Sequence, residues 1–381
     1  MKKPFCARCK FIAAGVLVTT LIFVSNASFP GEEPARHPVC DPPVGINVGL
    51  PSERVAWQKH AGANGEEHIF LVGFFDQGIE IFTTIFAFKY GPIKKFGYYS
   101  FLNEDSTGKK WFIKGECKSD YRDVSKTSLD INCGNTSFSG KWPEWKLVIN
   151  EKEFQAELTY RATVPTFDVG RCFYTPDRKI HLDCFVFVPR GRVWGTVTTD
   201  GKVRKVSGQA YGDHSHQNLP PTRQGPFYYA VRVFPDPKTP DDEKLHLNFS
   251  NQALHKAYGG GADKFSFVVS DREVIGFTRN IDIKPLEVFE DPETGYKYVR
   301  RVKITAMGEN FTVNGLFAVD DVIEIFDIYQ WLPPWARKIA EKFWKRPVYF
   351  RFLGKFNGVL DIDGNTVRIK QRATSEMNFT Q

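Results

Sequence analysis

The stretch Ile69–Phe88, IFLVGFFDQGIEIFTTIFAF, decides the fold class. Two runs rich in β-branched and aromatic residues, Ile69–Phe75 and Ile79–Phe88, are separated by Asp76-Gln77-Gly78. Such runs around a short turn segment are typical of a β-hairpin. The stretch therefore predicts two antiparallel strands, and it gives the pattern to look for in the rest of the chain.

The same pattern of short strands recurs in two series. The first continues with residues 111–114, 146–149, 155–160, 185–188 and 192–198, and the second comprises residues 227–234, 245–249, 265–269, 273–277, 298–305, 311–319, 348–353 and 357–362. Regular short strands with turns between them favour a barrel or a sandwich. Pro220-Pro221 would break a strand, so we expect the boundary between the two series near residues 219–226.

One helix is expected near the C-terminus, in PPWARKIAEKFWKR, residues 333–346. Trp335, Ile339 and Phe343 recur at a spacing of four residues and form one apolar stripe. Pro334 suits the first turn of a helix. A single helix beside a barrel is a lipocalin-like feature, and its expected role is to close one end of that barrel.

The N-terminus reads as a secretory signal. Basic residues precede the apolar run Phe11–Val24, and small residues then lead to a cleavage point after Ala27. The alternative is an uncleaved anchor. We expect a signal peptide over residues 1–27, a flexible Pro-rich leader over 28–45, and a mature chain that is secreted or periplasmic.

Five cysteines follow the predicted signal. Cys172 and Cys184 flank a turn-like segment, so a hairpin would bring them face to face, and Cys117 and Cys133 would close a second loop. Cys40 is then left unpaired. The alternative is five buried thiols, because free cysteine is often buried.

The amino-acid composition favours an apolar ligand over nucleic acid as the partner. The 381 residues carry a net charge of +7 and include 34 Phe, which suits a protein that encloses a bulky apolar ligand. A Phe-rich core without a ligand is the alternative. The Lys and Arg residues do not alternate with aromatic residues as in a nucleic-acid surface, so no nucleic acid is expected. Peripheral contact with an anionic membrane surface is compatible with the charge.

Polar residues gather in GQAYGDHSHQNLPP, residues 208–221. On an extended strand, Tyr211, Asp213 and Ser215 share one face, and His214 and His216 share the other. His-x-His is a spacing found in metal sites. His181, His246 and His255 are candidates for further ligands, and nothing in the sequence selects one of them. We nevertheless expect no metal and no cofactor.

Two other interpretations of this stretch stay open. Asp213 would act as a general acid if burial in an apolar pocket kept it protonated, with Tyr211 and His214 orienting it. The alternative is structural, in which these side chains satisfy buried backbone groups where two barrels meet.

The segment Phe185–Pro221 resembles the signature segment of the lipocalin-like fungal survival-factor family. The matching positions are Phe187, Pro189, Arg190, Gly195, Thr196, Asp200, Gly201, Lys202, Gly208, His214, Gln217 and Pro220. The hairpin Glu66–Phe88 and the tail Asp320–Leu360 are similar to its first strands and its C-terminal barrel. The stretch also resembles the related carotenoid 1,2-hydratase (hydroxyneurosporene synthase) superfamily, whose Gly-x-x-Tyr-x-Asp-His pattern fits Tyr211, Asp213 and His214.

The resemblance implies an all-β protein of two tandem lipocalin-like barrels, over residues 46–222 and 223–381. It implies binding of a hydrophobic ligand, a lipid or an isoprenoid, with a link to oxidative-stress protection. The alternatives are a hydratase or cyclase acting on an isoprenoid, with Tyr211, Asp213 and His214 as catalytic residues, and a protein-binding module with filled barrels. The expected ligand-binding residues are Arg190, Trp194, Tyr211, Asp213, His214, His216 and Gln217.

Overall fold

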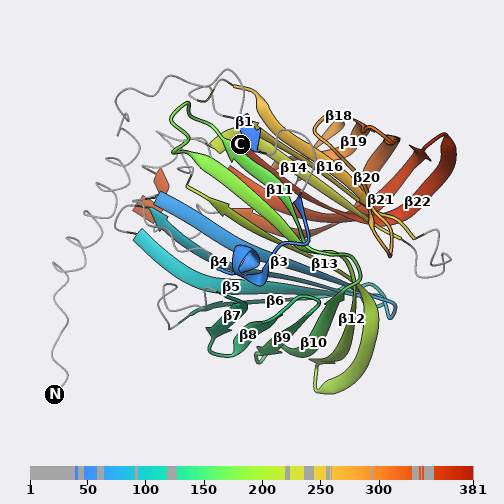
Figure 1. Cartoon of the computed structure of the whole chain (residues 1–381). Coiled ribbons are helices and arrows are strands. Elements are labelled where there is room, and N and C mark those ends of the chain that lie inside the picture. Colours follow the sequence, from blue (N-terminus) through green and yellow to red (C-terminus); the bar gives the residue numbers. More distant parts are fainter. Residues whose placement is uncertain are drawn as a thin grey trace, which may run out of the picture.

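The computed structural model of the chain contains two large antiparallel sheets (Figure 1). It describes residues 39–41, 47–57, 64–90, 93–117, 127–218, 224–235, 244–254, 258, 260–292, 295–327, 334–335, 337–338 and 347–380. Within these residues the first sheet ends at Gln217 and the second begins at Gln224.

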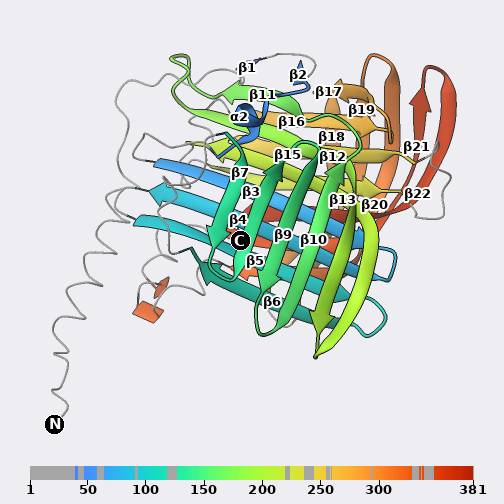
Figure 2. The same cartoon turned by 60° about the horizontal axis from the view of Figure 1, so that its bottom comes forward.

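The first sheet contains thirteen strands among the described residues. They are β1 (Val39–Asp41), β2 (Asn47–Val48), β3 (Asn64–Phe75), β4 (Ile79–Tyr90), β5 (Ile93–Glu104), β6 (Lys109–Glu116), β7 (Leu129–Cys133), β8 (Thr136–Lys141), β9 (Glu144–Asn150), β10 (Phe154–Ala162), β11 (Phe167–Phe173), β12 (His181–Thr199) and β13 (Lys202–Gln217). Their order is β6-β5-β4-β3-β13-β12-β10-β9-β8-β7, with β11 pairing β12, β1 and β2. Figure 2 shows β7 to β10 and β12 side by side along one flank of the sheet.

The second sheet contains nine strands in the part of the chain that the structure describes. They are β14 (Gln224–Phe234), β15 (His246–Leu254), β16 (Ala262–Val269), β17 (Val274–Thr278), β18 (Ile281–Glu290), β19 (Lys297–Met307), β20 (Phe311–Asp327), β21 (Pro347–Ile362) and β22 (Asn365–Thr380). Their order is β17-β16-β15-β14-β22-β21-β20-β19-β18.

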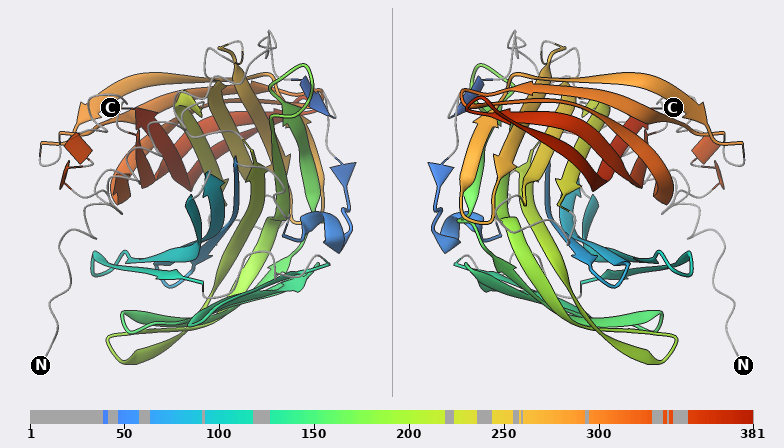
Figure 3. Two further views of the ribbon diagram at one scale, coloured as in Figure 1. Left: turned by 90° about the vertical axis from the view of Figure 1, so that its left-hand side faces the viewer. Right: turned by 90° about the vertical axis from the view of Figure 1, so that its right-hand side faces the viewer.

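Each sheet pairs an early strand with its last one. β3 lies against β13, and β14 lies against β22. Both sheets are strongly curved into barrel-like shapes that face each other (Figure 3). The all-β fold class predicted from the sequence is therefore confirmed.

The predicted strands lie in the observed ones, with two mergers. Residues 185–188 and 192–198 belong to one strand, β12, because the chain passes Pro189 through register shifts instead of leaving the sheet. Residues 348–353 and 357–362 likewise form one strand, β21. Polar strands such as β5, β18 and β22 carry too weak an apolar alternation to be predicted.

The predicted C-terminal helix lies largely outside the described residues, as do the predicted signal peptide and most of the leader. A four-residue helix, α2 (Ser52–Val55), is described near the start of the first sheet. No helix in the described ranges has the length and apolar character needed to cross a bilayer.

The run IFLVGFF in β3 is apolar on both faces because both faces are buried. Ile69, Leu71 and Phe75 pack into the core of the first barrel. Phe70 and Phe74 pack between the two sheets, against residues of the second sheet that include Phe234, Phe267 and Leu353. A strand covered on both sides has no reason to alternate with polar residues.

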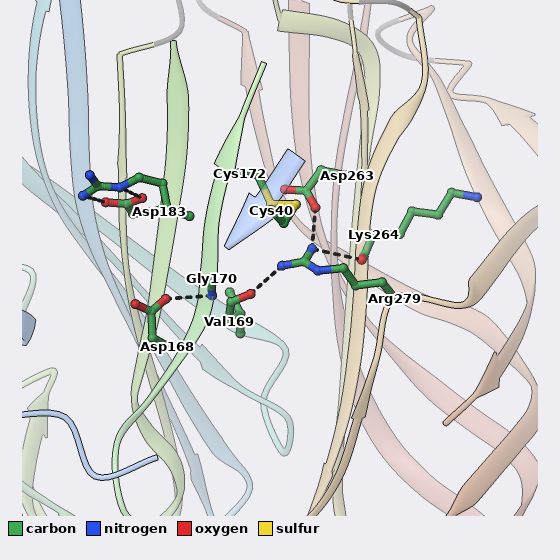
Figure 4. Close-up of a disulfide and its surroundings, with 10 residues drawn as sticks. Cys40, Asp168, Val169, Gly170, Cys172, Asp183, Asp263, Lys264 and Arg279 are labelled. Carbon is green, nitrogen blue, oxygen red and sulfur yellow. Dashed lines mark hydrogen bonds and ion pairs between the residues drawn. A yellow bond between two sulfur atoms is a disulfide. The ribbon is translucent and has the colours of Figure 1, made fainter. Parts of the chain in front are cut away.

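The disulfides correct one of the two predicted pairings. Cys117 is joined to Cys133, as expected. Cys172, however, is joined to Cys40, and Cys184 is a free cysteine (Figure 4). The register explains the difference, because Cys172 on β11 lies directly opposite Cys40 on β1, whereas its partner on β12 is Leu182.

Candidate functional site

Strand β13 separates the predicted catalytic residues onto two faces. Tyr211 packs in the cluster between the sheets, and Asp213 contacts Arg232 of the second sheet. His214 points the other way and contacts Glu67. The alternation follows from the pleat of the strand. Tyr211, Asp213 and His214 therefore do not converge on one reacting centre.

The side of β13 that bears Asp213 faces a buried group of charges, here called the seam cluster: Asp213, Arg232, Glu324, Arg351 and Glu376. Arg232 Nη2 lies 3.0 Å from Asp213 Oδ2, and its Nη1 lies 3.0 Å from Glu376 Oε2. Arg351 Nη1 lies 2.9 Å from Glu324 Oε2, and its Nη2 lies 3.1 Å from Glu376 Oε1. Each of the five side chains is at most 7% exposed.

The strand register places three of these charges in one row. Arg351 on β21 lies opposite Glu324 on β20 and opposite Glu376 on β22. Directly opposed residues share one face of the sheet, with their Cβ atoms about 5 Å apart. The carboxylate–guanidinium–carboxylate row is thus fixed by backbone pairing, and Arg232 connects it to Asp213 on the first sheet.

The two glutamates of the row differ in their proton affinity. Burial raises the pKa of Glu324 to about 7, and nearby Arg351 counters only part of that effect. Burial acts in the same direction on Glu376, but Arg232 and Arg351 outweigh it and hold its pKa at about 2. Near neutral pH, Glu324 is consequently the carboxyl of this pair that can give up or take a proton.

Aromatic rings surround both guanidiniums. Arg232 lies 4.7 Å from the ring centre of Phe70 and 4.9 Å from that of Tyr211. Arg351 lies 4.8 Å from Phe70 and 5.2 Å from Phe82. Phe70 thus contacts both cations. Such contacts are favourable because the face of an aromatic ring is electron-rich.

Asp213 forms an ion pair with the second sheet, in which Arg232 donates a hydrogen bond of 3.0 Å to Asp213. Tyr211 accepts a hydrogen bond of 3.0 Å from Asn248 Nδ2, and burial raises the pKa of Tyr211 well above its ordinary value. Both residues therefore hold the two sheets together through polar contacts.

His214 forms a separate buried pair inside the first barrel. Its Nδ1 lies 2.8 Å from the Val55 carbonyl oxygen, and its Nε2 lies 2.7 Å from Glu67 Oε1. A carbonyl only accepts, so Nδ1 carries a proton. The other ring nitrogen, Nε2, faces the carboxyl group of Glu67. Both side chains are fully buried, and the ring stacks on Trp57.

The remaining predicted ligand residues are dispersed. Arg190 links the sheets through Asp271 at 2.7 Å. Trp194 is 39% exposed on the outer surface of β12. Gln217 donates to Glu66 at 3.1 Å, and His216 lies 3.6 Å from Asp183. These positions do not form one pocket.

His214 and His216, the candidate metal-ligand pair, contact different carboxylates, since His214 contacts Glu67 and His216 lies near Asp183. His246 is buried between the sheets against Tyr211 and Phe234. His255 lies outside the described residues. Between the two candidate further ligands that the structure describes, His181 lies beside His216, with 5.2 Å between ring centres.

A small recess lies beside α2, lined by residues that include Leu50, Val55 and Trp145. Its free volume is about 10 Å³, which is room for one water molecule. None of the predicted site residues lines this recess.

Sequence reasoning missed four members of the seam cluster, Arg232, Glu324, Arg351 and Glu376. A signal for two of them was present, because Arg232 and Arg351 each interrupt an apolar, aromatic run, YYAVRVF and VYFRFLG. A lone charge inside a strand buried on both faces needs a buried counter-charge. Which counter-charge it meets depends on strand register and sheet packing.

Comparisons with known proteins agree with this architecture. The chain is similar to an AttH candidate from Nitrosomonas europaea, with a TM-score of 0.59, 12% identity, and coverage of 87% of this chain and 97% of that one. It is similar to kievitone hydratase from Nectria haematococca, with a TM-score of 0.54, 12% identity, and coverage of 93% and 99%. It is also similar to CghA with Sch210972, with a TM-score of 0.56, 10% identity, and coverage of 92% and 95%.

At these identities the similarity shows the fold, which is a double-barrel, lipocalin-like one. A search among curated proteins gave no match. The model of the Svf1 family matches residues 113–379, which is more than half of the sequence. The chain therefore belongs to the Svf1 family.

Proposed function

We propose that this protein binds a hydrophobic ligand with a polar end, a lipid or an isoprenoid, between its two sheets. The observation that carries the proposal is the seam cluster and its ring of aromatic side chains. The polar end of the ligand would contact Arg232 and Arg351, and its apolar part would pack on rings such as Phe70 and Phe82.

The energetics favour a role for this cluster beyond holding the sheets together. Moving an ion out of water costs several kcal/mol, and an apolar core of similar volume is often equally or more stable. The interface already has ample apolar material in Phe74, Phe234 and Phe267. Charged groups in such surroundings are typical of the few oriented polar groups in a ligand site.

The cellular setting belongs to the same proposal. A signal peptide over residues 1–27 would place the protein outside the cytoplasm, and a net charge of +7 would favour brief contact with anionic membranes from which a lipid is taken up. Protection against oxidative stress would follow if the ligand is an oxidisable lipid. No nucleic acid or cofactor forms part of this function.

The second candidate function is a hydratase or cyclase acting on an isoprenoid, and Glu324 favours it. A carboxyl with a pKa of about 7 is suited to protonate an alkene near neutral pH. Its proton would move to one alkene carbon and leave a cation on the other. Water would then add to that cation and return a proton to Glu324. A hydratase is among the proteins of similar fold.

The test is organic extraction and native mass spectrometry of the protein purified from its host. A discrete bound lipid or isoprenoid is expected, and Arg232→Met should release it, whereas the matched surface variant Arg301→Met should retain it. The side chain of Arg301 is 49% exposed. A protein without a bound molecule that also takes up no apolar dye would refute the binding function.

The variant Glu324→Gln, purified in the same way, distinguishes a carrier from an enzyme. In a carrier, Glu324→Gln keeps both the ligand and its chemical structure. In an enzyme, Glu324→Gln still binds the ligand but no longer converts it, because the amide has no proton of suitable acidity to transfer.

A further inference from the structure

We propose that His181, Asp183 and His216 bind one divalent transition-metal ion, with Zn²⁺ as the probe. This site is distinct from the seam cluster, and the proposal does not depend on the proposed function. The proposal rests on three possible ligand atoms that come from two adjacent strands, β12 and β13.

The sheet register brings the three residues together. His181 and Asp183 are two positions apart on β12, so their side chains leave the same face. His216 on β13 lies directly opposite Asp183. Two imidazoles and one carboxylate therefore share one patch at the end of the β12–β13 ladder.

The three ligand atoms lie near one another, although somewhat further apart than around a bound ion. His216 Nδ1 lies 3.6 Å from Asp183 Oδ2, and the possible ligand atoms of the three residues all lie within 4.8 Å of one another. Tetrahedral coordination with bonds of about 2.0–2.1 Å places ligand atoms about 3.3 Å apart. Small side-chain rotations would bring the three ligand atoms to bonding distance from one ion.

His181 is arranged as a metal ligand. Its Nδ1 lies 3.3 Å from the Lys179 carbonyl oxygen, which can only accept, so the proton is on Nδ1 and the lone pair on Nε2. Within the described structure, that buried Nε2 has no hydrogen-bond partner. A hydrogen bond from the non-ligating nitrogen to a backbone carbonyl is the usual outer contact of a metal-bound histidine.

Arg171 binds the carboxylate of Asp183 but leaves some of its acceptor positions open. Arg171 donates from Nε to Oδ1 at 2.6 Å and from Nη2 to Oδ2 at 2.5 Å. A carboxylate offers about four lone-pair positions, so two remain for an ion and a further donor. Arg171 would then fix the orientation of the carboxylate, as outer contacts of metal ligands do.

The donor set points to the class of ion. Two imidazole nitrogens and one carboxylate oxygen suit Zn²⁺ and neighbouring first-row ions, and they do not suit Mg²⁺ or Ca²⁺, which prefer oxygen alone. The His216 side chain is 12% exposed, so an ion can reach the site from solvent. Three protein ligands leave a fourth position for water or another small ligand.

The test is a Zn²⁺ titration of the protein purified from its host and stripped with a chelator, followed by calorimetry and by metal analysis. One Zn²⁺ per chain is expected. His181→Gln and His216→Gln should each weaken binding by about tenfold or more. The matched control His68→Gln removes a partly exposed histidine of β3 that pairs with Ser215, so that it lies on the opposite face of the sheet from His216, and this variant should bind as the unaltered protein does.

A second measurement uses the unaltered protein, so the proposal can still be tested if the variants fail to fold. Co²⁺ in the site should give visible absorption bands of a nitrogen- and oxygen-ligated, four- or five-coordinate ion. Strong near-ultraviolet thiolate bands would place the ion on cysteine and overturn the proposal. Absence of stoichiometric Zn²⁺ binding, or equal binding by the folded His181 and His216 variants, would overturn it as well.

Discussion

Replacement of Glu324 by Gln is expected to change how the stability of this protein depends on pH. Glu324 is buried opposite Arg351, and burial raises its pKa from 4.5 to about 7. The folded protein therefore holds this proton more tightly than the unfolded chain does. Glutamine has nearly the same shape as the protonated side chain but cannot ionise, so it removes this one titration.

The contribution of Glu324 to the free energy of unfolding follows from the difference in its proton affinity between the folded and unfolded states. Between pH 4.5 and 7 the folded state binds more protons at Glu324 than the unfolded state, so its contribution to stability is complete at low pH and is lost as the pH rises. Each tenfold change in proton affinity corresponds to about 1.4 kcal/mol, which gives about 3 kcal/mol in total. Most of this, about 2 to 3 kcal/mol, falls between pH 5 and pH 8.

The assay is urea unfolding of the unaltered protein and of Glu324→Gln at pH 5, 6, 7 and 8. The free energy of unfolding of the unaltered protein, minus that of the variant, should fall by about 2 to 3 kcal/mol over this range. The matched control Glu157→Gln changes a glutamate whose side chain is 61% exposed and should give a flat difference. A flat difference for Glu324→Gln would refute the argument that burial controls its proton.

Two further predictions concern other parts of the fold. Peptide mapping without reduction should yield a peptide pair linked through Cys40 and Cys172, and a pair linked through Cys172 and Cys184 would contradict the observed register. His214→Ala should lower the free energy of unfolding by about 3 kcal/mol, because it removes the buried ring that contacts Glu67. Urea unfolding measures this loss, and an unchanged stability would show that the pair is energetically neutral.

Much of the local structure could be predicted from the sequence. The hairpin at Ile69–Phe88 follows from two runs of strand-forming residues around a short turn. The period of two along a strand correctly separates Tyr211 and Asp213 from His214. These properties depend on neighbours within a few residues, and the backbone geometry of a strand fixes them.

The partners of the buried polar groups could not be predicted in this way. Asp213 meets Arg232, and Arg351 meets Glu324 and Glu376, through strand register and through the packing of one sheet on the other. The sequence contains many carboxylates and arginines, and no local rule says which of them are removed from water together.

The all-β class, the positions of most strands and the two faces of β13 follow from local sequence patterns, because alternation and turn preference act over a few residues. The pairing of Cys172 with Cys40, the seam cluster and the position of His216 beside His181 and Asp183 depend on the folded arrangement of distant strands. Charge pairing, proton affinity and metal-ligand geometry instead depend on which distant strands are brought within a few ångströms and shielded from water.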